Sequence, residues 1–390
     1  MTKSKTQPKN CLRVEVSTKA WRKAKLRSLG KVITGTTPPT AQKADYFGGS
    51  FPFITPTDIA DFNVRYNYIT ERFLSDKWGD EAKKILIPKG STCFVCIGST
   101  IGKICLTKDN SFTNQQINTI VVDSQKADFK YVYYLLKNNQ GNIIKQYGGG
   151  GSGKAIINKS TFESIEFVIP ENPNEQKRIA DILSGFDDKI ELNNKINQNL
   201  EQTAQAIFKE WFVNSKNSKN WKTKKITEII KRLPVGKKYD NKTAFSKGKI
   251  PVLDQGQSGF IGYHNDQPGV KASVESPVVI FTNHTCNYRL MTCDFSCIQN
   301  VLPYVGDKDY STLFVYFLTK GKIKMQEYKG HWPEFEEQVF LIPPPPLAQK
   351  FTDYIKPVIE KMVGIENENQ KLASLRDLLL PKLMSGEIRV

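Results

Sequence analysis

The sequence predicts an α+β fold in which two β-rich domains are separated by a pair of long antiparallel coiled-coil helices, as a pseudo-twofold internal repeat. The first observation is a recurring segment that ends in Ile-Pro, as TFESIEFVIPENPNEQK from Thr161 and PEFEEQVFLIPPPPLAQK from Pro333. The second is a set of short β-branched and aromatic runs before each copy of this segment. The third is a long amphipathic stretch after each copy.

The repeat sets the expected domain boundaries. Trp21 and Trp221 each open a basic run, and GSFPFIT from Gly49 corresponds to GKIPVLD from Gly248. The expected organisation is a polar tail at 1–20, a β-rich domain at 21–172, a central long helix at 173–214, a linker at 215–220, a second β-rich domain at 221–343, and a distal long helix with the C-terminal tail at 344–390.

The β-rich character comes from runs such as STCFVCIG, INTIVV, SPVVIFT and EQVFLIP. Gly, Asn and Asp residues separate these runs, as expected of strands joined by tight turns. YVYYLLKN from Tyr131 and STLFVYFLTKG from Ser311 predict a short helix at the same place in each copy.

Each helical stretch is roughly 30 to 40 residues long, so about 45 to 60 Å if continuous. In the second, Pro357 predicts a kink or a delayed start, and Pro381 lies near its end. Asn193, Asn197 and Asn369 interrupt the apolar stripes. They either pair across two packed helices and fix their register, or lie on a solvated edge. A bundle within one domain is the alternative arrangement of these helices.

Composition favours a polyanionic partner. The 390 residues include 56 Lys and Arg against 39 Asp and Glu, which gives a net charge of +17. Neither a membrane span nor a signal peptide is expected, so we expect a cytoplasmic protein. Seven scattered cysteines indicate reduced thiols. A basic membrane-surface protein is a weaker alternative, because no basic amphipathic helix is evident.

The stretch YGGGGSGKAIINKS has the spacing of a nucleotide-binding phosphate loop at Gly148, Gly153 and Lys154. Ala155 follows the lysine where such loops place the hydroxyl that holds magnesium. The segment also leads into a β-rich ending rather than a helix. We therefore expect Lys154 to contact a nucleic-acid phosphate rather than ATP.

Two other patterns suggest metal chemistry. Asp58 with Glu81 and Lys83 resembles the carboxylate set of magnesium nucleases, although a solvated helix face explains Glu81 and Lys83 more simply. Asp58 alone would either accept a hydrogen bond from cytosine or cap a turn. Zinc is disfavoured, because the candidates lack paired ligand spacing or, for Cys93 and Cys96, point to opposite faces of a strand. The other zinc candidates are His284, Cys286, Cys293 and Cys297.

Several motifs along almost the whole chain are informative through their order, duplication and spacing rather than through any one of them. In the first half these are ITGTTPP from Ile33, PFITPTDI from Pro52, IGSTIGKICL from Ile97, NQQIN from Asn114 and IPENPNEQKRIADILSGFDDKIELNN from Ile169. In the second half they are GKIPVLDQGQSGFIGY from Gly248, IPPPPLAQKF from Ile342 and LLLPKLMSGEI from Leu378. With these motifs, almost the whole chain resembles the specificity (S) subunits of type I restriction-modification systems.

The resemblance implies two target recognition domains, each binding one half of a bipartite site in double-stranded DNA. It implies that the helices set the spacing and dock two modification (methyltransferase) subunits, which bring S-adenosylmethionine. Restriction subunits would bring ATP hydrolysis, Mg²⁺, translocation and cleavage. The chain itself would have no cofactor, no metal and no catalytic activity. The alternative is an enzyme in its own right, either a magnesium nuclease or a nucleoside triphosphatase.

Residue chemistry then selects candidate contacts, because lysines bind phosphate while amides and hydroxyls in turns can read base edges. The DNA-binding candidates are Thr36, Thr37, Thr57, Lys103, Gln115, Gln116 and Lys154 in the first domain, and Lys237, Lys238, Gln255, Gln257, Ser258, Asn283, His284 and Lys329 in the second. The partner-binding candidates on the helices are Ile182, Phe186, Ile190, Leu200, Ile207, Ile355, Met362, Leu372 and Leu379.

Overall fold

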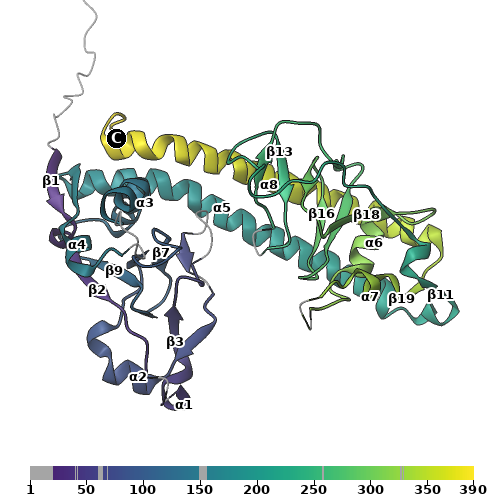
Figure 1. Cartoon of the computed structure of the whole chain (residues 1–390), viewed down its shortest axis with the longest axis horizontal. Helices are drawn as coiled ribbons and strands as arrows, with labels where there is room; N and C mark the ends of the chain where they lie inside the picture. Colours follow the sequence, from purple (N-terminus) through teal and green to yellow (C-terminus); the bar gives the residue numbers. More distant parts are fainter. Residues whose placement is uncertain are drawn as a thin grey trace, which may run out of the picture. The chain divides into compact units, whose positions relative to one another are not determined.

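The structure is a computed structural model that describes residues 21–39, 41, 43–59, 65–67, 69–148, 156–256, 259–325, 327 and 329–390. The expected polar tail at 1–20 lies outside these residues. The chain divides into two units (Figure 1). Unit 1 runs up to Glu191 and resumes over Lys371–Val390, and unit 2 is Leu192–Gln370. The mixed α and β composition that the sequence predicts is confirmed.

The described residues of unit 1 form three β-sheets. The largest has the order β2(Gly30–Thr34), β9(Ile117–Val122), β6(Thr92–Val95), β7(Ile104–Thr107) and β4(Tyr66–Asn67). A second has the order β5(Arg72–Leu74), β3(Phe47–Ile54) and β8(Phe112–Thr113), in which β3 and β8 are parallel. The third pairs β1(Trp21–Lys25) with β10(Glu166–Pro170) in antiparallel register.

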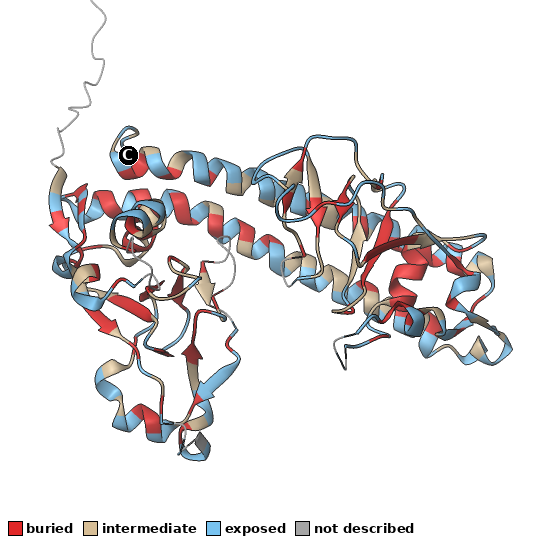
Figure 2. Ribbon diagram, in the orientation of Figure 1, coloured by how far each residue is buried: buried red, intermediate tan, exposed pale blue. Residues whose placement is uncertain are grey.

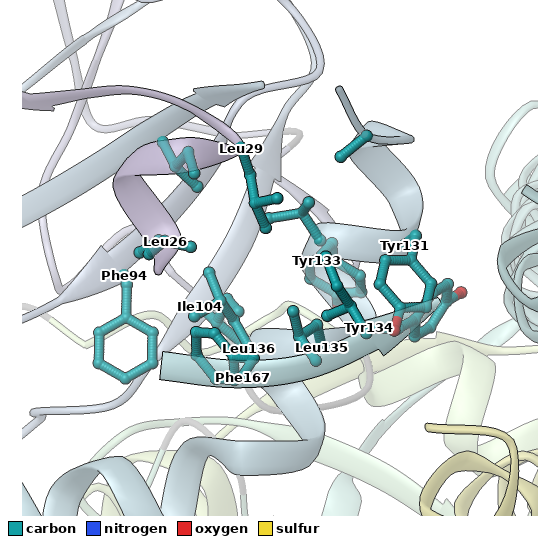
Figure 3. Close-up of a cluster of buried hydrophobic side chains, with 14 of the residues drawn as sticks. Leu26, Leu29, Phe94, Ile104, Tyr131, Tyr133, Tyr134, Leu135, Leu136 and Phe167 are labelled. Carbon is teal, nitrogen blue, oxygen red and sulfur yellow. The ribbon is translucent and has the colours of Figure 1, made fainter. Parts of the chain in front are cut away.

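The helices of unit 1 outside the long pair are short, except for one. They are α1(Lys43–Tyr46), α2(Asp76–Glu81), α3(Phe129–Tyr147) and α4(Lys159–Ser164). The helix expected from Tyr131 is confirmed as α3, which begins after Asp128 because that carboxylate accepts a hydrogen bond from the Tyr131 N–H. Its buried aromatic and aliphatic face fills the core beside Leu26, Phe94 and Phe167 (Figure 3).

Where the structure describes unit 2, it also forms three sheets. Its largest has the antiparallel order β12(Ile230–Arg232), β18(Val301–Gly306), β15(Val278–Thr282) and β16(Tyr288–Met291). A second has the order β14(Gly262–His264), β13(Ile250–Leu253) and β17(Ser296–Cys297), in which β13 and β17 are parallel. The third pairs β11(Lys222–Lys225) with β19(Val339–Ile342).

Two short helices complete the domain of unit 2, α6(Thr312–Thr319) and α7(Trp332–Glu336). The helix expected near Ser311 is confirmed as α6, and the Ser311 hydroxyl accepts its capping hydrogen bond from the Phe314 N–H. The core joins this helix to both long helices through contacts among the rings of Phe208, Phe314 and Phe351.

The two long helices are α5(Pro173–Phe208) and α8(Pro345–Ser385). Of the two effects expected at Pro357, the delayed start is wrong, since α8 begins at Pro345 and continues through Pro357, and the kink stays a prediction. Buried and exposed residues alternate along both helices as expected of amphipathic helices (Figure 2). Among the described residues, no helix is long and apolar enough to cross a membrane.

The asparagines of the apolar stripes pair between the helices rather than lying on a solvated edge. In unit 2 the Asn193 Nδ2 donates to Asn369 Oδ1 at 2.9 Å and to Glu368 Oε2 at 2.8 Å. The Asn197 Nδ2 donates to the Met362 carbonyl at 3.1 Å. The partner's number in α8 falls as the number in α5 rises, so the helices run antiparallel in this unit.

Some partner-binding candidates lie in the interior of the chain. Ile190 and Ile355 are buried inside the chain itself. Their assignment to a partner-binding surface is therefore corrected. Ile207, Met362 and Leu379 are half-buried against the two cores. Ile182 is 38% exposed, while three more candidates on the helices are half-buried: Phe186, Leu200 and Leu372. The spacing of apolar residues identified the apolar stripe of each long helix. It did not show which residues of the stripe face the neighbouring helix.

Candidate nucleic-acid interface

Four loop segments meet at one end of the five-stranded sheet of unit 1. The loop after β2 starts beside the loop before β9, because Thr34 is paired with Asn118. Farther along, the Thr37 Oγ1 donates to Gln115 Oε1 at 2.8 Å. The segment between β6 and β7 joins them, since the Cys96 N–H donates to the Gln116 carbonyl at 2.7 Å.

The loop after β3 is held against the same end of the sheet. The Asn114 N–H donates to the Ile54 carbonyl at 3.3 Å. The Lys103 Nζ donates to the carbonyls of Ile59 at 2.8 Å and Pro56 at 3.4 Å. Gly35 packs so closely that an added Cβ would lie 2.1 Å from the Thr113 carbonyl oxygen. Sequence-distant turns therefore form one continuous surface.

The structure brings Thr36, Thr37, Gln115 and Gln116 together on this surface. Thr36 and Gln115 are exposed, whereas Thr37 and Gln116 are half-buried. Exposed Thr57 lies on the adjoining loop that Lys103 holds. The Lys103 ammonium group thus holds the loop after β3 in place. Its contact with a DNA phosphate stays a prediction.

Lys154 lies outside the described residues. The described residues on either side of its glycine-rich segment adjoin the same surface. Gly148 caps α3, and Ile156 forms a β-bridge with Ile97 in the segment between β6 and β7. The proposed contact of Lys154 with a DNA phosphate stays a prediction.

Asp58 caps a turn, as one of its two predicted roles required. Its Oδ2 accepts from the Thr55 N–H at 2.8 Å and from the Thr55 hydroxyl at 2.6 Å, and its Oδ1 accepts from the Glu71 N–H at 2.8 Å. Glu81 instead accepts from the Tyr46 hydroxyl at 2.8 Å. The two carboxylates thus have separate structural partners, and no metal-binding cluster of three acidic, histidine or cysteine residues occurs in the described ranges.

Most cysteine side chains in the described residues lie in the protein interior, whereas Cys293 is exposed. Cys96 accepts from the Asn118 Nδ2 at 3.2 Å. Burial raises the pKa of the Cys96 thiol to about 12 and that of Cys297 to about 11. Both thiols therefore stay protonated at neutral pH, whereas zinc requires the thiolate.

In unit 2 the structure brings together four candidates from three separate segments. The Gln255 Oε1 accepts from the His284 N–H at 3.3 Å. The Asn283 Oδ1 accepts from the Trp332 N–H at 2.8 Å. The His284 Nδ1 lies 2.9 Å from the Lys329 carbonyl, to which it donates. Gln257 and Ser258 lie outside the described residues.

The three candidate lysines of unit 2 differ in their surroundings. Lys237 pairs with Asp266 at 2.8 Å, and this hydrogen bond raises the pKa of the lysine. Lys329 pairs with Glu334 at 2.8 Å, with the same effect on its pKa. Lys238 is exposed and has no hydrogen-bond or ion-pair partner within the described part of the chain.

Sequence analysis missed Gln299 and Asn300, which lie in the turn between β17 and β18. Two adjoining hollows share Lys238, Ile298, Gln299 and Asn300 in their linings. The sequence contains a pattern that could have identified these two residues. IQN precedes the strand VLPYVG in the second copy, as NQQ precedes INTIVV in the first copy.

A buried polar network lies next to this surface. The His264 Nδ1 accepts from the Asp266 N–H at 3.1 Å, so the ring proton is on Nε2, which donates to Ser296 Oγ at 2.9 Å. The ring also stacks on Tyr239 with 4.1 Å between centroids. These contacts tie β14 to β17 and to the segment that carries Lys238.

Acid should destabilise unit 2 through His264. Burial lowers its pKa in the folded state, so the unfolded chain takes up the proton at a higher pH. The stability contribution of the neutral ring is fully present above about pH 6.5 and is lost as the pH falls through the lowered folded pKa. We expect the Tm to fall between pH 7.5 and 5.5 more steeply in the wild type than in His264→Asn.

His331 provides the matched control. Its hydrogen bond to Glu334 raises its pKa, so its stabilisation is present below about pH 6.5 and is lost as the pH rises. His331→Asn should therefore steepen the acid loss. Calorimetric melting curves check both variants, and an unchanged acid slope in His264→Asn would contradict the assignment.

A family model described as "Type I restriction modification DNA specificity domain" matches residues 18–202. The MjaIX type I restriction enzyme specificity subunit of Methanocaldococcus jannaschii is 28% identical over 414 residues, covering 95% of this chain and 94% of the relative. The HindI specificity subunit of Haemophilus influenzae is 33% identical over 153 residues, covering 39% of this chain and 32% of the relative.

A solved structure shares the fold. The crystal structure of a type I restriction-modification S subunit from M. genitalium aligns with a TM-score of 0.55 at 18% identity. The alignment covers 95% of this chain and 97% of that one. The likeness therefore extends beyond the region that the family model matches.

Proposed function

Because the chain belongs to the specificity subunits of type I restriction-modification systems, we propose that its two β-rich domains each bind one half of a bipartite DNA site. The observation that carries this proposal is the meeting of Thr36, Thr37, Gln115 and Gln116 at one sheet end. Such hydroxyl and amide groups can read base edges. A specificity subunit is a recognition protein, and the alternative of a nuclease or nucleoside triphosphatase has no support among the relatives.

We propose residues 21–172 and 221–343 as the two target recognition domains, related by an internal repeat. Corresponding strands have corresponding partners, which supports this proposal. The matching pairs are β1 with β10 and β11 with β19, β2 with β9 and β12 with β18, and the parallel pairs β3 with β8 and β13 with β17.

The long helices are proposed to form an antiparallel coiled coil that sets the distance between the half-sites. The hydrogen bond from buried Asn193 to half-buried Asn369 supports this, because a buried amide in an apolar interface is satisfied in only one register. Asn193 is 1% exposed, so a shift of either helix would leave its amide without a partner.

The same helices are proposed to dock two modification subunits, with restriction subunits joining the complex in the cytoplasm. Support comes from apolar side chains that unit 1 leaves exposed on them, namely Ile182 at 38%, Leu375 at 49% and Leu378 at 59%. S-adenosylmethionine, ATP and Mg²⁺ are assigned to these partner subunits.

Gel shifts of the chain assembled with its modification subunits test the function. At physiological salt the assembly should bind one split sequence at least about a thousandfold more tightly than unrelated duplexes. Equal affinity for all duplexes would show that the basic surface binds DNA without specificity.

A further inference from the structure

Most candidate base contacts of unit 2 already have partners inside the chain. The Gln255 side chain accepts from the His284 N–H, and the Asn283 side chain accepts from the Trp332 N–H. His284 in turn donates to the Lys329 carbonyl. These hydrogen bonds fix the loops to one another, which is the role of groups that support a binding surface.

Gln299 has a different environment. It is exposed, and its amide has no hydrogen-bond partner within the described residues. It lines both adjoining hollows together with Lys238, which is likewise exposed and without a partner there. The amide thus keeps both its donor and its acceptor available to a ligand.

The backbone that carries Gln299 is held on both sides. The Ile298 N–H donates to the Leu253 carbonyl at 3.0 Å, and the Asn300 carbonyl accepts from the Asn283 N–H at 2.8 Å. Asn300 adopts a φ of 71°, a left-handed conformation that asparagine tolerates better than most residues. A fixed turn of this kind limits the entropy that Gln299 loses on binding.

The charges around the turn indicate where DNA phosphates would lie. Asp240 and Asp254 line one hollow, and their carboxylates repel phosphate. Among the described residues, the charged side chains that line the other hollow are those of Arg232 and Lys238. A DNA phosphate backbone that binds on this basic side would leave the Gln299 side chain directed at the adjoining base edges.

The corresponding turn of unit 1 has the same chemistry. Gln115 and Gln116 lie between β8 and β9, as Gln299 lies between β17 and β18. In both units the strand before the turn is parallel to its neighbour, β3 or β13. The two turns therefore occupy equivalent positions in the strand pairing.

We propose that Gln299 is a base-reading residue of unit 2, with its amide bound to the major-groove edge of an adenine and Lys238 bound to a phosphate. A glutamine amide matches the N6 donor and N7 acceptor of adenine in a bidentate pair. This inference rests on the proposed function and adds the residue that determines specificity at one position.

The test measures the affinity of the assembled methyltransferase for its target and for every single-base change in both half-sites. Gln299→Ala should reduce discrimination about ten- to a hundredfold at one adenine-containing position of one half-site and leave the others unchanged. Lys238→Gln should weaken binding equally for all sequences and lower the salt dependence by about one phosphate contact. Gln338→Ala, which lines neither hollow, is the matched control and should change nothing.

The outcomes separate the inference from the proposed function. If the wild-type assembly has no preferred sequence, the function itself is wrong. If the wild type is specific but Gln299→Ala keeps full discrimination at every position, Gln299 does not read a base. Uniform weakening by Gln299→Ala without relaxed discrimination would also overturn the inference, because it would place the amide on the DNA backbone.

Discussion

Replacing Asp187 with alanine is expected to lower the free energy of unfolding of unit 1 by about 3 kcal/mol, because the change removes the buried carboxylate that faces the buried Arg376 guanidinium, whose other ion-pair partner, Asp377, is more than half exposed. Arg376 on α8 is 1% exposed and donates to Asp187 Oδ1 on α5 at 2.5 Å. The Tyr134 hydroxyl of α3 donates to Asp187 Oδ2, also at 2.5 Å. One carboxylate thus joins three helices of this unit.

Denaturant unfolding of the full chain measures this loss. Asp181→Ala is the matched control, since Asp181 pairs with Lys177 one helical turn away where both side chains are at least half exposed. That control should cost less than about 1 kcal/mol. A loss below about 1 kcal/mol for Asp187→Ala would mean that the buried pair does not stabilise the unit.

Lengthening both long helices by four residues is expected to change the spacer of the DNA site. The insertions belong between Glu191 and Leu192 in α5 and between Gln370 and Lys371 in α8, where the two units meet in the chain. They leave the Asn193 to Asn369 and Asp187 to Arg376 contacts intact. Four residues add about 6 Å of helix, which corresponds to about two base pairs.

The lengthened protein should select the same half-sites with a longer spacer and should bind the original site about a thousandfold less tightly. Selection from a library of spacers by the assembled methyltransferase checks this result. A four-residue insertion after exposed Glu275 is the control and should keep the original spacer. Changed half-sites, or an unchanged spacer in the lengthened protein, would contradict the proposed role of the helices.

The sequence predicted the large elements well because their signals are local or periodic. The helix from Tyr131, the helix from Ser311 and the two long helices all follow from the spacing of apolar residues and from capping side chains. The delayed start expected from Pro357 is wrong because a proline disrupts a helix only in part when the surrounding packing holds it. In α8 the neighbouring Phe351, Ile355 and Ile359 are buried in the core of unit 2.

The candidate site was harder to predict, because a polar residue in a turn looks the same whether it binds a ligand or a neighbouring loop. Lys103 and Asp58 both bind backbone groups of the chain, which only tertiary structure reveals. Gln299 was missed although IQN stands before its strand as NQQ does in the first copy. The hollow around it and the absence of a partner among the described residues distinguish it from an ordinary turn residue.

Sequencing of methylated DNA from cells that carry the intact system tests the central claim most directly. Two separate domains that each bind a half-site predict one defined motif, with two specified parts divided by a spacer of fixed length. Methylation scattered without a motif, or confined to one uninterrupted sequence, would contradict the account.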